Sequence, residues 1–359
     1  MIILNVPKKK IVEVVTGLGL GGAEKALSAK LRYASKDFQT VIFNHQTKLD
    51  QIPFSKQIKI VESSNNFLVL SHKFLKLAKT FEPDYVIVRT PLDAIRFSFL
   101  KLASKKSRWK LVFEAHSNFL TSKRFFNFVI APLLRLSKKN IDLTIAVSEN
   151  VRVGPLCISS TELKVLHLGA DIEIGNPNFP DSQPPKLIFL GRLVEVKNPL
   201  LLVSAICRIK DDINIADGFL TIVGDGPLMR SLRSYISENK LGNIIQLAGY
   251  QDDVTRFLMQ ATHLVSVSSN EGLPISFFEA KLAGLRIIST PSGGGSEIFD
   301  DFDYELPSFE IQDLVDHLRS ILGTAITSES RQQIAKNSVW MQAKECSKKY
   351  YELLESLAD

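Results

Sequence analysis

The sequence has little cysteine and no long apolar segment. Its three cysteines, at positions 157, 207 and 346 of 359 residues, do not have the spacing of metal ligands. A sparse, odd number argues against a disulfide framework and is typical of a reducing compartment. No run reaches 18 uncharged apolar residues, and the apolar run at the start is too short for a signal peptide. We therefore expect a cytoplasmic protein without a transmembrane helix.

Acidic residues are scarce in the first half of the chain, and basic residues are scarce in the second. Residues 1–170 hold 27 lysines and arginines against 12 acids, a net charge of +15, whereas residues 171–359 carry −9. This contrast supports two domains in a chain of this length. The basic half predicts an anionic partner, such as lipid headgroups, nucleic acid or a phosphorylated acceptor. We do not expect nucleic acid, because no recognised nucleic-acid module accompanies the basic residues.

Apolar strands alternate with amphipathic helices through the first half. The expected strands are residues 11–15, 39–43, 58–61, 85–88, 111–115 and 143–147. This alternation predicts an α/β fold with a doubly wound parallel sheet. Ligands of such sheets bind beyond the carboxyl ends of the strands, where His116 and Ser148 fall. His116 is therefore a candidate active-site residue, although a lone histidine is also a common structural residue.

A glycine-rich stretch follows the first expected strand and opens a helix. It reads Gly17-Leu18-Gly19-Leu20-Gly21-Gly22-Ala23-Glu24-Lys25. Such a turn lets the backbone approach a phosphate closely. Gly17, Gly19 and Gly22 match the dinucleotide spacing, but that site also needs an acid after the second strand to hold the ribose. The second strand ends in Asn44-His45-Gln46, which argues against NAD binding.

The pattern restarts after a boundary rich in proline. Residues 171–185 contain four prolines and read as a linker between residues 1–170 and 186–338. The second region again alternates strands and helices, and residues 340–357 are expected to form one long closing helix. The sequence therefore predicts two Rossmann-like domains.

The stretch Glu271–Glu279, which reads EGLPISFFE, follows a buried apolar strand. Gly272 allows a tight turn, and Pro274 suits the first helical position. Glu271 should then lie on the loop, and Glu279 about a turn and a half inside the helix. Two carboxylates beside a helix N-terminus suit a polyol ligand that carries phosphate. The plainer alternative is a capped helix with two solvated acids.

Arg192 and Lys197 lie together on another loop at a strand end, in Gly191-Arg192-Leu193-Val194-Glu195-Val196-Lys197. A forked donor and a flexible ammonium group on one short loop suit a diphosphate. Alone, each could be an ordinary surface residue. Their combination with Glu271 and Glu279 on a neighbouring strand end favours a ligand site.

Residues 122–140 are apolar at the centre and basic at both ends, and residues 101–110 add further lysines and an arginine. One interpretation is a patch that lies on an anionic membrane. The other is a core helix with solvated ends. We expect Pro132 to break the helix, and the two interpretations stay open.

Together these motifs resemble the retaining glycosyltransferases of family four, which have the GT-B fold. The resemblance covers nearly the whole chain. The motifs that carry it, in chain order, are Gly21-Gly22-Ala23-Glu24, Gly191-Arg192-Leu193 with Lys197, Gly224-Asp225-Gly226-Pro227, the pair Glu271 and Glu279, and the glycines before Glu297.

The resemblance implies two Rossmann-like domains facing each other across a cleft. Residues 1–170 would bind the acceptor, residues 171–185 would link the domains, residues 186–338 would bind the nucleotide-sugar donor, and residues 339–359 would form a helix crossing back. The acceptor would be a lipid-linked or growing oligosaccharide, as in polysaccharide or lipopolysaccharide biosynthesis. The basic first domain would place the enzyme peripherally on a membrane face.

The resemblance also implies roles for single residues. Arg192 and Lys197 would bind the diphosphate and stabilise the leaving group, and Glu279 would hold the ribose hydroxyls. His116 would contact the sugar near the reacting carbon. Glu271 and the backbone after it would hold the transferred sugar, Tyr250 would meet the base, and two glycines would approach the diphosphate. The positions meant are Gly21, Gly22, Tyr250, Glu271, Gly272, Leu273, Pro274 and Ile275.

The reaction would retain the anomeric configuration. No Asp-x-Asp of the kind that holds a metal–diphosphate occurs, so no metal or other cofactor is expected. The sequence departs from the family at His167-Leu168-Gly169-Ala170-Asp171 and after Glu297, where a usual glycine is missing. The alternatives are a nucleotide-sugar 2-epimerase on the same architecture and a non-catalytic nucleotide-sugar-binding scaffold.

Overall fold

The computed structural model describes most of the chain. The described residues are 8–16, 22–45, 58–104, 108–116, 124–154, 157, 162–174, 179–211 and 215–357, with the backbone alone at 124–129 and 131.

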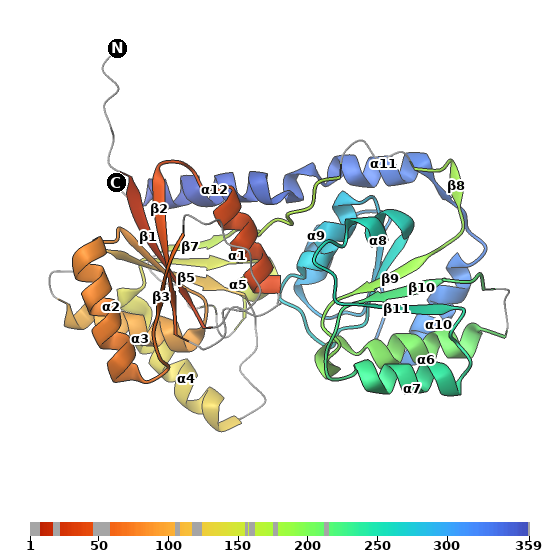
Figure 1. Ribbon diagram of the computed structural model, residues 1–359, viewed down its shortest axis with the longest axis horizontal. Helices are drawn as coiled ribbons and strands as arrows, with labels where there is room; N and C mark the ends of the chain where they lie inside the picture. Colours follow the sequence, from red (N-terminus) through yellow and green to blue (C-terminus); the bar gives the residue numbers. More distant parts are fainter. Residues whose placement is uncertain are drawn as a thin grey trace, which may run out of the picture. The chain divides into compact units, whose positions relative to one another are not determined.

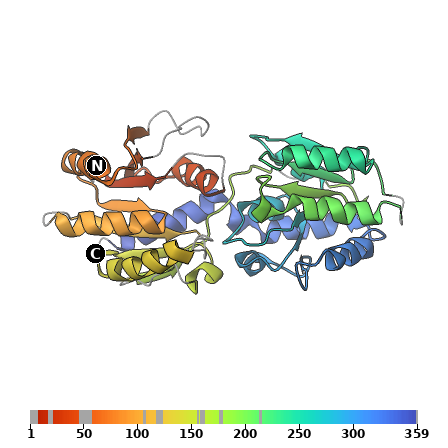
Figure 2. The same cartoon turned by 90° about the horizontal axis from the view of Figure 1, so that it is seen from below.

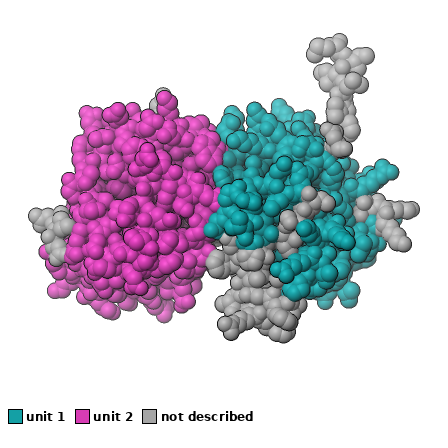
Figure 3. Space-filling view, turned by 180° about the vertical axis from the view of Figure 1, so that it is seen from behind, with its two compact units in different colours: residues 1–169, 343–359 teal, residues 170–342 magenta. Residues whose placement is uncertain are grey.

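The chain forms two compact units, which are coloured separately in Figure 3. Unit 1 comprises residues 1–169 and 343–359, and unit 2 comprises residues 170–342. The expected linker, residues 171–185, therefore falls within unit 2. One reason is that β8 (Ser182–Gln183) pairs with β15 (Ile326–Thr327) in a short antiparallel ribbon.

A seven-stranded parallel sheet forms the centre of unit 1. Its strands in spatial order are β3 (Lys59–Glu62), β2 (Phe38–Asn44), β1 (Lys9–Val15), β4 (Tyr85–Val88), β5 (Lys110–Ala115), β6 (Leu143–Ala146) and β7 (Glu162–Val165). The apolar runs that predicted the central strands are buried on both faces, as parallel sheets require. Chain order reverses between β1 and β4, so their carboxyl ends form a switch point.

Helices cover both faces of this sheet. One face, below the sheet in Figure 1 and toward the viewer in Figure 2, carries α2 (Phe67–Phe81), α3 (Pro91–Ala103) and α4 (Arg124–Ser137). On the other face α1 (Gly22–Arg32) packs against α12 (Ala343–Ser356). The first face is filled by an edge-to-face aromatic cluster of Phe43, Phe74, Phe97 and Trp109. Short helices are η1 (Lys138–Asn140) and α5 (Glu149–Arg152).

Unit 2 repeats the plan with six parallel strands. Their spatial order is β11 (Ile245–Gly249), β10 (Leu220–Val223), β9 (Leu187–Leu190), β12 (His263–Ser266), β13 (Arg286–Ser289) and β14 (Tyr304–Glu305). The switch point lies between β9 and β12. The structure thus confirms a parallel, doubly wound α/β organisation in both units.

Alternate residues of β9 enter two separate cores. Leu187 and Phe189 pack in the core under α6, α7 and α10, whereas Ile188 packs in the core under α8 and α9. The helices and 3-10 turns of unit 2 are η2 (Glu195–Lys197), α6 (Pro199–Ile209), α7 (Met229–Glu238), α8 (Thr255–Gln260), α9 (Ile275–Leu282), η3 (Gly294–Ile298), α10 (Ile311–Ile321), α11 (Ser328–Asn337) and η4 (Val339–Met341).

Two helix predictions were wrong. The closing helix begins at Ala343, because extended Gln342 separates it from η4. Pro132 does not break α4, which continues through it to Ser137. A proline removes one helical hydrogen bond, but burial of Ile130 and Leu134 in the described part of α4 favours the continuous helix.

A buried histidine follows β2. Nδ1 of His45 lies 2.8 Å from the Oδ1 atom of Asn65, and its Nε2 lies 3.1 Å from the Oδ1 atom of Asp93. Burial lowers the pKa of His45, but the contacts with Asp93 and Asn65 outweigh it, and the pKa is raised above 6.5. Arg96, which also contacts Asp93, acts in the opposite direction.

The Asp93→Asn variant tests this contact. It should lower the pKa of His45, because the neutral amide no longer favours the imidazolium. A raised folded-state pKa stabilises the protein below the unfolded value, and that contribution disappears as the pH rises through the folded value. The loss of melting temperature in Asp93→Asn should therefore be larger at about pH 6 than at about pH 9. NMR titration of His45 and thermal melts check this; an unchanged titration would contradict it.

Candidate functional site

The site residues predicted in unit 2 gather at the switch point of its sheet. The loop after β9 carries Arg192 and Lys197, and the loop after the adjacent strand β12 carries Glu271. Both loops leave carboxyl ends of parallel neighbours, so they emerge on the same edge of the sheet. The reversal of chain order therefore juxtaposes residues that are 74 positions apart in the sequence.

Glycines let the loop after β10 pack closely on the loop after β9. Gly224 has φ +147°, and a Cβ atom there would lie 1.8 Å from the carbonyl oxygen of Gly191. A Cβ atom at Gly226 would lie 2.6 Å from the carbonyl oxygen of Leu193. The backbone N–H of Leu193 donates to the carbonyl of Asp225 at 2.9 Å. Only glycine fits these two positions, and the packing fixes the backbone on both sides of Arg192.

An ion pair joins the loops after β9 and β12. The ammonium group of Lys197 contacts Oε1 of Glu271, and the hydroxyl of Ser268 donates to the same oxygen at 2.7 Å. The backbone N–H of Ser269 donates to the carbonyl of Val196 at 2.8 Å. Sequence reasoning placed Lys197 and Glu271 in one site without predicting that they contact each other, and it missed Ser268.

Arg192 differs from Lys197 in its surroundings. Its side chain is exposed, and within the described part of the chain no carboxylate pairs with it. The guanidinium group is thus available for an external anion, whereas the Lys197 ammonium already holds Glu271 and can use its other N–H groups.

Glu279 lies inside α9 and is 6% exposed. The helix begins at Ile275, and extended Pro274 precedes it as the N-cap, so the prediction of Pro274 at the first helical position is wrong by one residue. The difference follows from the extended ψ of 124° at Pro274. The loop residues Gly272 and Leu273 remain half-buried between the ion pair and the helix.

The loop after β12 is also joined to the loop after β13. The N–H of Glu271 donates to the carbonyl of Ser292 at 2.7 Å, and the N–H of Gly294 donates to the carbonyl of Glu271 at 3.3 Å. A Cβ atom at Gly295 would lie 2.5 Å from the Phe277 ring of α9. The glycines before Glu297 therefore bring this turn against the site helix.

An ion cluster around the buried Lys281 supports α9. Lys281 of α9 contacts Asp303 at 2.8 Å and Asp300 at 2.7 Å, and Asp303 also accepts from the N–H of Ile287. Burial raises the pKa of Asp303 against the opposing effect of Lys281. These aspartates occupy the segment where the sequence lacks the family's usual glycine. This segment therefore holds α9 in place through Lys281, a contact that the sequence did not predict.

Tyr250 lies further along the same edge. It follows β11, the outermost strand, and its hydroxyl donates to Oδ1 of Asp252 at 2.9 Å. Burial and Asp252 raise its pKa to about 12, so the phenol stays neutral. Tyr250 therefore shares the edge with the charged residues but is separated from β9 by β10.

Unit 1 places its predicted residues at its own sheet edge. Gly22 begins α1 and is exposed, while Gly21 lies outside the described residues. His116 follows β5, and its Nε2 lies 2.7 Å from Oε1 of Glu114. The structure thus brings His116 into contact with a buried acid that sequence reasoning did not select.

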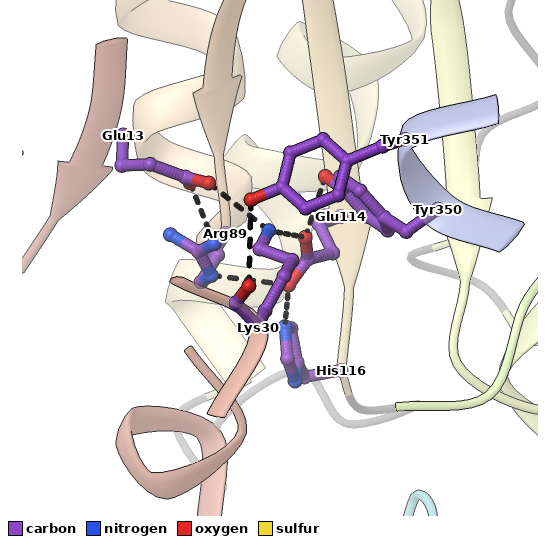
Figure 4. Close-up of polar contacts among 7 residues, drawn as sticks. All are labelled: Glu13, Lys30, Arg89, Glu114, His116, Tyr350 and Tyr351. Atoms are coloured by element: carbon purple, nitrogen blue, oxygen red, sulfur yellow. Dashed lines mark hydrogen bonds and ion pairs between the residues drawn. The ribbon is translucent and has the colours of Figure 1, made fainter. Parts of the chain in front are cut away.

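Glu114 belongs to a buried cluster in unit 1 (Figure 4). Arg89 bridges Glu114 at 3.1 Å and Glu13 at 2.7 Å, and Lys30 of α1 lies 2.9 Å from Glu114 and 3.0 Å from Glu13. Burial opposes ionisation of Glu114, but Arg89 and Lys30 outweigh it and hold its pKa well below the usual range. The sequence signal was an acid inside an otherwise apolar strand, at Glu13 and again at Glu114.

The described part of the chain has neither a cluster of metal ligands nor a membrane-spanning helix. No group of three or more histidine, cysteine, aspartate or glutamate side chains in this part of the chain could hold a metal ion. None of its helices combines the length and the apolar character needed to cross a membrane.

Unit 2 and parts of the chain are similar in sequence to known glycosyltransferases. Residues 172–339 match the family described as "Glycosyl transferases group 1". A similar curated protein is the UDP-Gal:alpha-D-GlcNAc-diphosphoundecaprenol alpha-1,3-galactosyltransferase of Escherichia coli, 34% identical over 116 residues, which are 32% of this chain and 30% of that protein. This match spans less than a third of that relative.

Longer matches have lower identity. The N-acetylgalactosamine-N,N'-diacetylbacillosaminyl-diphospho-undecaprenol 4-alpha-N-acetylgalactosaminyltransferase of Campylobacter jejuni is 24% identical, over 83% of this chain and 85% of that protein. Anabaena Alr3699/HepE in complex with UDP has a TM-score of 0.75 at 16% identity, over 97% of this chain and all of that chain. The lipopolysaccharide outer core galactosyltransferase WaaB has a TM-score of 0.73 at 20% identity, over 97% of this chain and 99% of that chain.

The structural matches cover nearly the whole chain and show the fold. The family match and the names of the relatives support a glycosyltransferase. Residues 172–339 are therefore similar to the glycosyl transferases group 1, within a chain that has the GT-B fold.

Proposed function

We propose that the protein is a retaining glycosyltransferase that moves a sugar from a nucleotide diphosphate sugar to a lipid-linked or growing glycan acceptor, without a bound metal. The observation that carries this proposal is the charged cluster at the β9–β12 switch point. Arg192, Lys197 and Glu271 lie there on two loops joined by an ion pair, and Glu279 lies in the helix that follows.

The two cations suit the diphosphate of the donor. Arg192 is exposed and offers a planar fork of N–H groups, which matches phosphate oxygens. Lys197 has three N–H groups, so it can hold Glu271 and still donate to phosphate. Both positive charges would stabilise the nucleoside diphosphate as it leaves, in place of a metal ion.

The carboxylates suit the hydroxyl groups of the donor. Glu279 is buried near the start of α9, where a ribose diol can donate to its oxygens. Glu271 and the backbone from Gly272 to Ile275 would hold the transferred sugar, and Tyr250 would meet the base. His116 of unit 1 would contact the sugar near the reacting carbon.

The surroundings of Glu271 argue against a covalent glycosyl–enzyme step at this residue. One carboxylate oxygen already accepts from both Lys197 and Ser268. These contacts stabilise the anion and make it a poorer nucleophile. Retention would then follow from attack on the face from which the diphosphate departs, with a departing phosphate oxygen taking the acceptor proton.

The names of the relatives support a proposal for the class of donor and acceptor. The names of both curated relatives describe transfer to a saccharide on a diphosphate-linked undecaprenol, and one of them names UDP-galactose as donor. We infer that this protein uses a UDP-sugar in preference to a GDP-sugar, and that its acceptor carries a polyprenyl diphosphate.

A lipid-linked acceptor fits a basic surface on unit 1. Exposed residues of α2, of the end of α4 and of η1 combine apolar and basic side chains: Leu68, Lys73, Leu75, Lys76, Lys79, Arg135, Leu136 and Lys139. Apolar side chains beside lysines suit an interface with anionic lipid. We propose that this surface docks peripherally on the cytoplasmic face of a membrane.

Donor binding can be measured by thermal shift with UDP, GDP, ADP and their common sugars in EDTA. Donor at 100 times its dissociation constant should stabilise the protein by about 2.7 kcal/mol. Arg192→Ala and Glu279→Gln should lose this stabilisation, because each removes a direct contact. Arg233→Ala, an exposed arginine of α7, is the matched control and should keep it. A shift that requires Mg²⁺ or Mn²⁺, or that survives in both site variants, would contradict the proposed donor site.

Lys197→Ala should lower the turnover number by about 10²–10³, because the leaving group loses one stabilising charge. Transfer from UDP-galactose to a saccharide-diphosphoundecaprenol acceptor is the assay. Lys186→Ala changes an exposed lysine just before the opposite end of β9 and should stay within about twofold of wild type. Equal rates in the two variants would refute the role of Lys197.

Membrane docking predicts a charge-dependent affinity for vesicles. Lys76→Glu together with Lys139→Glu should weaken flotation with vesicles of anionic phospholipid, because about 1 kcal/mol is expected for each basic residue near the surface. Lys344→Glu changes an exposed residue of α12, on the other side of the sheet in Figure 1, and should float like wild type. No flotation of the wild-type protein would rule out the docking surface.

A further inference from the structure

The carboxylate of Glu114 accepts from four donors (Figure 4). Oε1 faces Nε of Arg89 at 3.1 Å and Nε2 of His116 at 2.7 Å. Oε2 accepts from Nζ of Lys30 at 2.9 Å and from the hydroxyl of Tyr350 at 2.8 Å. A carboxylate has about four acceptor positions, so the donors around Glu114 fill its capacity.

The charge of Glu114 decides which atom carries the proton in its contact with His116. Lys30 and Arg89 keep the buried carboxylate ionised, and an ionised carboxylate can only accept. Nε2 of His116 must therefore be the donor. In the neutral ring the other nitrogen, Nδ1, is then an acceptor, and Figure 4 shows it on the side of the ring away from Glu114.

We propose that Glu114 and Tyr350 are positioning residues that fix His116 with its proton on Nε2, so that Nδ1 accepts a hydrogen bond from a hydroxyl group of the sugar. This rests on the proposed function, in which His116 contacts the sugar. The side chain of His116 is 20% exposed, so its ring reaches from the buried cluster to the surface.

Tyr350 connects α12 to the pair of Glu114 and His116. Burial and the charges of Glu114 and Glu13 raise the pKa of Tyr350 well above its ordinary value, so the phenol is a permanent donor. Removal of its hydroxyl leaves Oε2 with Lys30 alone. The negative charge of the carboxylate, less screened by donors, then attracts its remaining donors more strongly. The resulting change should appear at His116.

Tyr351 provides the matched control. It is the next residue of α12 and is equally buried, but its hydroxyl lies 3.5 Å from the backbone carbonyl of Lys30 and does not contact Glu114. Tyr350→Phe and Tyr351→Phe therefore each remove one buried hydroxyl from the same helix. Only the first removes a hydrogen bond to Glu114.

The experiment is long-range ¹H–¹⁵N NMR of the full chain labelled with [¹⁵N]histidine, with His116→Gln to assign the resonances. In the wild-type protein with a neutral His116 ring, Nε2 should show the shift of a protonated nitrogen, and Nδ1 that of an unprotonated one. Tyr350→Phe should move both ¹⁵N shifts of His116, and Tyr351→Phe should leave them in place. Glu114→Gln, if it folds, should populate both tautomers.

A proton on Nδ1 in the wild-type protein would overturn the proposal, and so would equal changes in the two tyrosine variants. Neither readout needs a sugar donor. Expected NMR shifts without any sugar transfer would therefore contradict the proposed function alone. Sugar transfer without these shifts would contradict only the positioning role.

A double-mutant cycle gives the kinetic test. Tyr350→Phe should lower the turnover number about 2-fold to 150-fold in the wild-type background, which is the usual range for coupled neighbours. It should have no further effect in the His116→Ala background. A similar loss in both backgrounds would show that Tyr350 acts through stability, and would overturn its positioning role.

Discussion

A parallel strand covered by helices on both faces has no room for an unsatisfied polar side chain along its length. This constraint shapes both units. Their central strands are largely apolar, and most of the charged side chains of the proposed site lie where strands end. In unit 2 the switch between β9 and β12 brings two such ends together, and the contact of Lys197 with Glu271 joins them. Where a strand carries a buried acid, at Glu13 and Glu114, lysine and arginine neutralise it.

The two units meet that constraint in different ways. At the switch point of unit 2 the charges are partly exposed, with side-chain exposures of 26% for Lys197 and 11% for Glu271. That exposure leaves N–H groups and oxygens within reach of a ligand. In unit 1 Glu114 is 1% exposed and its acceptor positions are filled, so it cannot bind a ligand itself. It can act only through a neighbour that reaches the surface, and His116 is that neighbour.

Much of the proposed donor site follows from local sequence, because strand, glycine turn and helix start lie within about ten residues of one another. Arg192, Lys197, Glu271 and Glu279 were placed on this basis. Their mutual contacts could not be predicted, since they depend on which strands are neighbours. The same holds for Glu114 and Tyr350, which are 236 residues apart. The errors at Pro132 and Pro274 have another cause: helix bounds depend on tertiary packing as well as on proline's own preferences.

The return of α12 to unit 1 makes that unit dependent on the end of the chain. Unit 2 is one continuous segment, residues 170–342, whereas unit 1 also needs residues 343–359. Tyr350 satisfies Glu114, and the hydroxyl of Tyr85 in β4 donates to the carbonyl of Leu354 at 2.6 Å. Contacts so distant in sequence form late, because a long loop must close first. The carboxylate of Glu114 therefore has its four donors only after α12 has been synthesised and has returned to unit 1.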